Sequence, residues 1–185
     1  MLAVADRHGP AGRSPLLGPS PSRDAEAVTL TTDQVWSALG RASFAVLSHV
    51  TPAGAPRSTG VLYAAHDRRL FVVVASDGWK ARHIAADGRV SVTVPVRRGG
   101  PLSLLFPIPP ATVSFPATAV VHEAGSREGA RILSAMMHRL PRERLSQSRI
   151  IEIRPEGHFV TYGLGVSLTR MRHPGLARAR VPVSG

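Results

Sequence analysis

The chain has 185 residues, of which 43% are hydrophobic, which fits one folded domain and excludes a large multidomain protein. Lysine and arginine number 23 against 12 acidic residues, a formal net charge of +11, so anionic partners such as phosphates have to be considered. The absence of cysteine excludes disulfides, thiolate metal sites and cysteine nucleophiles, and it fits a reducing cytoplasm.

The first 28 residues are rich in proline, glycine and serine, and we expect residues 1–28 to form a disordered N-terminal tail. Asp6, Arg7 and Pro10 interrupt any apolar stretch near the start, so no signal peptide is expected. The longest uncharged run, residues 99–122, is broken by prolines and is not expected to span a membrane. We therefore expect a cytoplasmic protein that makes no contact with a membrane.

A folded domain is predicted over residues 29–165. It opens with a short helix over about 32–39, which Thr31 can cap, before the pattern becomes strand-like. The alternation predicts six strands, the last of them bent or a hairpin: 44–50, 55–65, 69–76, 90–96, 111–121, and 149–153 with 158–162. Pro116 is predicted to mark a bulge or an edge in the fifth strand.

Two further helices are predicted between the strands, a short one over 79–86 and an amphipathic one over 126–140. Short strands joined mostly by tight turns predict a mainly β fold, a six-stranded antiparallel barrel with peripheral helices. Residues 166–185 hold four arginines and no acid, and they are predicted to form a basic C-terminal tail.

The turn at residues 76–80 is the most suggestive local feature of the sequence. A strand that runs directly into a helix N-terminus presents free backbone N–H groups, to which Ser76 can add a hydroxyl and Lys80 a charge. The alternative is an ordinary N-cap followed by an exposed lysine. On the second strand Arg57 and Thr59 share one face, and the arginine needs either a ligand phosphate or an ordinary ion pair.

The sequence lacks the motifs of dinucleotide-binding proteins, phosphate-loop proteins, serine hydrolases and zinc proteases. The glycine run at residues 163–165 lacks the third glycine of a dinucleotide loop, and the sequence contains no phosphate loop, nucleophile elbow or zinc-binding HExxH. His83 could act as a proton donor or a ligand, but we interpret it as structural. Neither a metal site nor a catalytic residue is predicted.

Taken together, the segments FAVLSHVTPAGAPRSTGVLY, RRLFVVVAS and WKARHIAADGRVSVTV resemble the pyridoxamine 5′-phosphate oxidase-like family of flavin-binding split barrels, over residues 31–162. The most specific part is Lys80–Ile84 running into Val90-Ser91-Val92, which is similar to the family signature K-A-x-N-[L/I] … D-P-R-V. His83 stands where the signature has asparagine, and Gly88 where it has proline.

The resemblance implies a Greek-key split β-barrel that forms a homodimer and binds its cofactor at the subunit interface. FMN is the usual cofactor, with the deazaflavin coenzyme F-420 as the alternative, and the activity would be hydride transfer to or from a small organic substrate. The residues that would hold the cofactor ring and ribityl chain are Arg57, Ser58 and Thr59. Ser76, Lys80 and Arg82 would hold the phosphate, and Trp79 would also belong to the cofactor-binding set.

Several alternatives remain at this level. The arginine- and tryptophan-bearing C-terminal motif of true pyridoxamine phosphate oxidases is missing, so a role in vitamin B6 synthesis is not expected. A non-catalytic flavin- or heme-binding protein of the same fold is the main alternative. Nucleic acid is not expected as a partner, because only 5% of residues are aromatic and could stack on bases. The uncharged loop at residues 102–109 could line a substrate pocket or simply cover one end of the barrel.

Overall fold

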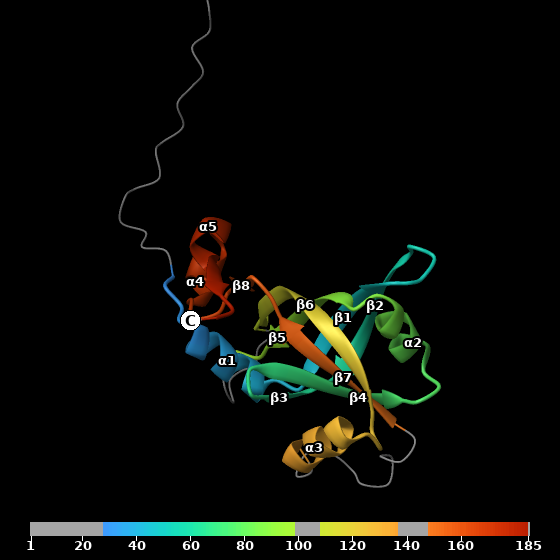
Figure 1. Cartoon of the computed structure of the whole chain (residues 1–185). Helices are drawn as coiled ribbons and strands as arrows, with labels where there is room; N and C mark the ends of the chain where they lie inside the picture. The colour runs from blue at the N-terminus through green and yellow to red at the C-terminus, as the bar shows by residue number, and fades with distance from the viewer. Residues whose placement is uncertain (1–27, 99–107, 137–147, 185) are drawn as a thin grey trace, which may run out of the picture.

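The computed structural model describes residues 28–98, 108–136 and 148–184, which form one curled antiparallel sheet with short helices around it (Figure 1). The strands are β1 (Phe44–Val50), β2 (Pro56–Leu62), β3 (Ala64–His66), β4 (Arg69–Ala75), β5 (Arg89–Val96), β6 (Ala111–Glu123), β7 (Ser148–Pro155), β8 (His158–Tyr162) and β9 (Arg178–Pro182). The helices are α1 (Thr32–Arg41), α2 (Trp79–Ala86), α3 (Arg127–Met136), α4 (Leu168–Met171) and α5 (Pro174–Ala177). The mainly β antiparallel split-barrel fold predicted from the sequence is confirmed.

The sheet runs in the order β2-β1-β5-β6-β7-β4-β3, and the 13-residue strand β6 joins its two halves. One edge of β6 pairs with β5 along most of its length. The other edge pairs first with β8, over residues 112–114, and then with β7, over residues 117–123. Pro116, which has no N–H to donate, lies in the gap between these two partners. The sheet splits at this proline, which therefore marks a change of partner inside the sheet.

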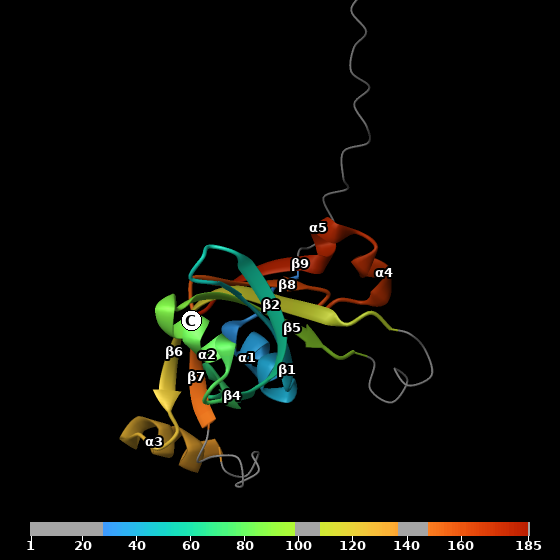
Figure 2. The same ribbon diagram turned by 90° about the vertical axis from the view of Figure 1, so that its right-hand side faces the viewer.

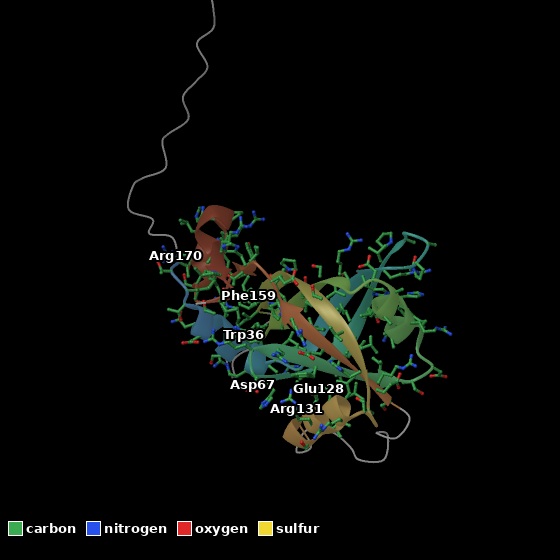
Figure 3. All side chains as sticks on the ribbon, in the orientation of Figure 1. Trp36, Asp67, Glu128, Arg131, Phe159 and Arg170 are labelled. Carbon is green, nitrogen blue, oxygen red and sulfur yellow. The ribbon has the colours of Figure 1, made fainter. Side chains whose placement is uncertain are left out.

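The main core fills the inside of the curled sheet, and α1 closes one end of it. α1 begins with a capping box between Thr31 and Gln34, as the sequence predicts. Its Trp36 meets Phe159 of β8 edge to face, with ring centroids 5.5 Å apart (Figure 3). Phe159 in turn makes the same kind of contact with Phe115 of β6, at 5.2 Å. These edge-to-face aromatic contacts hold α1 against β8 and β6.

The predicted strand over residues 55–65 is divided in the structure at Tyr63. The backbone N–H of Tyr63 donates to the carbonyl of Ser43, and its hydroxyl donates to the carbonyl of Leu39 at 2.7 Å. These two bonds tie the chain to the end of α1, and they separate β2 from β3. A tight turn joins β3 to β4, with Asp67 and Arg68 both at positive φ.

The C-terminal segment, predicted as a basic tail from residue 166, is part of the fold. β9 pairs with β8 over five residues, and its Val181 is only 2% exposed within the main core. α4 and α5 lie at the end of this pair of strands (Figure 2). The sheet therefore has nine strands instead of six, because 55–65 is divided, 149–162 forms two strands and β9 is added.

α3 covers a second, smaller cluster on the face of the sheet that carries Phe71 and Ile150. The helix predicted over 126–140 is confirmed over Arg127–Met136, and residues 137–147 lie outside the described part of the chain. Residues 1–27 of the predicted tail also lie outside it. No helix in the described segments combines the length and the hydrophobicity that crossing a bilayer requires.

A buried carboxylate lies on the same face as this second cluster. Glu152 of β7 has a side chain only 1% exposed. Its Oε1 accepts hydrogen bonds from Arg69 and Arg154, both at 2.8 Å, and its Oε2 lies 2.8 Å from Nε2 of His122. All the groups that contact the carboxylate are thus donors, and it is fully paired.

Candidate functional site

The strand β4 ends beside the start of α2, and the turn between them leaves the helix without a side-chain cap. Gly78 is the N-cap residue, and its N–H donates to the carbonyl of Ala75 at 3.0 Å. A Cβ at Gly78 would come within 2.9 Å of that carbonyl oxygen, so this tight turn requires glycine. Because neither Ser76 nor Asp77 caps the helix, the first N–H groups of α2 are available to an anion.

Three rings gather next to this helix N-terminus. His49, near the end of β1, packs against both Trp79 and His83 of α2, with ring centroids 5.6 Å and 5.5 Å away, and the centroids of those two rings are 5.4 Å apart. Nε2 of His49 and Nδ1 of His83 are 3.3 Å apart, within hydrogen-bond distance. The Lys80 ammonium lies 5.7 Å from the centroid of the Trp79 ring. The site therefore combines two imidazoles, an indole and a cation.

His49 is the buried member of this group, with only 3% of its surface exposed. Its Nδ1 has no hydrogen-bond partner among the described residues. Burial is the largest cause that holds the pKa of His49 below its ordinary value, and electrostatic interactions with His83, Arg57 and Lys80 act in the same direction, so the ring is neutral at pH 7. A buried imidazole nitrogen without a partner is costly, which indicates that a ligand group or water completes it.

The structure brings together only part of the set of site residues that the sequence predicted. Arg57 lies directly opposite His49 in the register of β1 and β2, and Thr59 follows on the same face. Ser58 points from the other face, where its hydroxyl lies 2.7 Å from that of Ser48. Ser76 is half-buried just after β4, and the side-chain N-cap that was the alternative interpretation of this turn is absent from α2.

The α2 residues of the predicted set differ in exposure. Lys80 is half-buried, and Trp79 is 41% exposed while its ring packs on the two histidines. Arg82 is exposed and pairs with none of the described acidic residues. Arg57, Trp79 and Lys80 are therefore the predicted residues that the fold places around His49.

His49 itself was missed by the sequence analysis, and His83 was interpreted as structural. The alternation in FAVLSHV already places His49 on the inner face of β1 with Ala45 and Leu47, which is a signal for a buried polar group. The contact between His49 and α2 has no signal in the sequence, because it depends on how the helix packs back onto the sheet.

The sequence matches the pyridoxamine 5′-phosphate oxidase family over residues 31–161, a span that contains the sheet from β1 to β7 and the whole of α2. The chain belongs to this family. No curated protein matches the sequence significantly.

Several solved structures share the fold of this chain. The heme storage protein HutZ from Vibrio cholerae superposes with a TM-score of 0.58 at 16% identity, covering 74% of this chain and 98% of its own. A heme-binding protein from Mycobacterium smegmatis gives 0.56 at 14% identity, with 85% and 60% covered. The general stress protein 26 from Bacillus anthracis gives 0.51 at 17% identity, with 70% and 92% covered. At these identities the likeness establishes the fold.

Proposed function

We propose that the protein is a cytoplasmic flavin- or deazaflavin-dependent oxidoreductase. It would transfer a hydride to or from a small organic substrate, with FMN or coenzyme F-420 bound at the interface of a homodimer. The observation that carries the proposal is the uncapped N-terminus of α2, which lies next to the buried His49 imidazole with its unpartnered nitrogen. Membership of the pyridoxamine 5′-phosphate oxidase family supports it.

The residues of the site fit the phosphate end of such a cofactor. The turn at Gly78 presents backbone N–H groups, and Lys80 and Arg57 add positive charge. The one acid of the turn, Asp77, is exposed and lies outside the helix. Trp79, with 41% of its surface exposed, offers a flat apolar side to a ring system.

In this proposal the protein binds and orients the cofactor, and the cofactor supplies the hydride chemistry. The helix N-terminus and Lys80 hold the phosphate, while Trp79 and the imidazole of His83 limit the access of water from the α2 side. His49, which is neutral at pH 7, would orient the ring of His83 through the 3.3 Å contact between Nε2 of His49 and Nδ1 of His83. The reaction needs no protein nucleophile.

The absorption spectrum of the purified protein tests the proposal, recorded before and after addition of FMN and, separately, of coenzyme F-420. We expect a shifted and sharpened cofactor band with one of the two. Oxidation of reduced nicotinamide or reduced deazaflavin by the loaded protein, with an organic acceptor present, then tests catalysis. Unchanged spectra with both cofactors would contradict the proposal.

A non-catalytic heme-binding protein is the second candidate, and the pair His49–His83 favours it, because a half-exposed imidazole is a suitable iron ligand. Two structures of similar fold are named for heme. Titration with hemin distinguishes this candidate. A sharp Soret band that is lost in His83→Ala, together with no turnover of flavin, would favour heme storage over oxidoreductase activity.

A further inference from the structure

A cavity of about 840 Å³ lies away from α2, where the end of α1 and the start of β1 meet the end of β5. Its lining includes Arg41, the last residue of α1, and Phe44, the first of β1. Arg97 and Arg98, which follow β5, complete its cationic side. Phe44 and His49 lie near opposite ends of β1, so this cavity is separate from the site around His49.

The three guanidinium groups of this cavity have no acidic partner among the described residues. Arg41 donates to the hydroxyl of Ser37 at 2.7 Å, and Arg98 contacts the carbonyl of Val166 and the sulfur of Met171. These acceptors are neutral, so they orient the side chains without cancelling their charge. Arg97 is exposed and forms no ion pair within the described segments.

The sequence around the cavity keeps this charge uncompensated. Residues 34–66 and 88–122, the two stretches that supply all of its described lining, contain no aspartate and no glutamate. The second stretch includes the connection from β5 to β6. A hollow with three positive charges and no acid in its described lining concentrates anions, because neighbouring lining residues do not cancel the field.

The lining also has an apolar part, here called the apolar wall, which includes Phe44, Pro95 and Ile108. The Phe44 ring is 44% exposed yet fixed in place, since it lies so close over Gly60 that an added Cβ there would meet a ring carbon at 2.8 Å. An aromatic surface held next to guanidinium groups suits a molecule that has one anionic end and one apolar end.

We propose that this cavity is a second anion site, which binds a small organic molecule carrying a phosphate or carboxylate group on an aromatic or aliphatic body. Arg41 and Arg97 bind the anionic group, and Arg98 adds its charge from a fixed position. Phe44 packs against the body of the molecule. Guanidinium groups suit both kinds of anion, because their planar donors match two oxygens at once.

Calorimetric titration of the full chain with phenyl phosphate, benzoate and inorganic phosphate tests the proposal. We expect phenyl phosphate to bind more tightly than inorganic phosphate, because only the ester uses the apolar wall. Arg97→Gln is expected to lower the affinity for phenyl phosphate by about tenfold, which is the cost of one charge-assisted hydrogen bond in a partly exposed site. Phe44→Ala is expected to lower the affinity for phenyl phosphate and to leave the affinity for inorganic phosphate unchanged.

The control is a cation outside both the cavity and the site around His49. Arg178→Gln changes an exposed arginine on β9 and is expected to bind phenyl phosphate as the wild type does. Benzoate binding that is lost in Arg97→Gln would assign the site to carboxylates. Absence of binding by the wild type, or an equal loss in Arg178→Gln, would overturn the proposal.

These outcomes are independent of the flavin proposal. Phenyl phosphate binding that is sensitive to Arg97 can be present whether or not FMN or coenzyme F-420 binds near α2. Because the titration uses the protein in its own oligomeric state, binding by the wild type also shows that the cavity is open in that state.

Discussion

Glu152 combines complete burial with three donors, and its pKa reflects the balance between them. Burial alone would raise the pKa of this carboxyl, but hydrogen bonds from Arg154 and His122, and the charges of Arg154 and Arg69, outweigh it. The pKa of Glu152 therefore lies below its ordinary value. The ionised form is stabilised by folding, so the contribution is complete above about pH 4.5 and is lost as the pH falls through the lowered pKa.

We expect Glu152→Gln to lower the free energy of unfolding at pH 7 by about 1–3 kcal/mol, since Arg69 and Arg154 are part-exposed and can turn to water. The acid dependence of stability below about pH 4.5 should become flatter in this variant. Urea unfolding measured from pH 3 to pH 8 gives both quantities. Glu128→Gln, which breaks the exposed pair with Arg131 on α3, is the matched control and should change stability little (Figure 3). Equal effects of the two substitutions would contradict the argument.

Lys80 is the one lysine of the chain, and in the proposed function it holds the cofactor phosphate. Loss of one charge-assisted bond to a partly buried group corresponds to about a tenfold to hundredfold loss of affinity. We expect this effect of Lys80→Ala on FMN or coenzyme F-420, measured by fluorescence titration. Riboflavin, which lacks the phosphate, should bind the wild type and the variant almost equally, and Lys80→Arg should retain most of the affinity. Unchanged affinity for the phosphorylated cofactor would mean that the start of α2 is an ordinary helix end.

At the scale of elements, local patterns were sufficient wherever a segment is bounded by its own turn chemistry. The bounds of β1, α2 and β8 are those predicted, because each has a clear period and ends at a turn or a glycine. The split of β2 from β3 depends on the bonds that Tyr63 makes with the end of α1, and no local pattern contains them. Glu152 and His122 likewise meet only through the pairing of β6 with β7.

β9 was missed for a different reason, because its arginines dominate the composition. In the sequence RARVP, alanine and valine alternate with arginine, which is the pattern of a strand with one buried face. In the candidate site, the local sequence predicts the helix turn with Lys80, and the alternation in β1 indicates the burial of His49. The contact of His49 with α2 depends on long-range packing, which no local pattern contains.

The contribution of β9 can be measured at its buried valine. Val181 is 2% exposed, so Val181→Ala should lower the free energy of unfolding by about 2 kcal/mol, from lost burial and the cavity left behind. Arg180→Ala, one residue away on the exposed face, should change it by less than about 0.5 kcal/mol. Chemical denaturation monitored by circular dichroism compares them. If Val181→Ala is as stable as the wild type, β9 does not contribute to the core in solution.

At the scale of the whole molecule, the outer face of β1 and β2 is the surface that a partner subunit would cover. Leu62 is 72% exposed there, directly opposite Phe44, and Val50 is 37% exposed on the same face. Apolar side chains gathered on one face of a sheet usually mark an interface. Because β2 also carries Arg57, a dimer formed through this face would place the two proposed cofactor sites near the interface.

We expect light scattering to give a dimer for the wild type at micromolar concentration, and a monomer for Leu62→Glu, because burial of an unpaired carboxylate is costly. Ser134→Glu adds the same charge on the exposed side of α3 and should leave the dimer intact. A dimeric Leu62→Glu protein would assign the interface to a different face, and a monomeric wild type would contradict the dimer itself.

The position of β6 also determines how the domain unfolds. Because β6 holds β5 on one edge and both β8 and β7 on the other, neither half of the sheet keeps a complete set of partners without it. Opening of either half exposes β6, so partial unfolding costs nearly as much as complete unfolding. We therefore expect the amides of β6 to be the slowest to exchange with deuterium, and to exchange only when the whole domain unfolds.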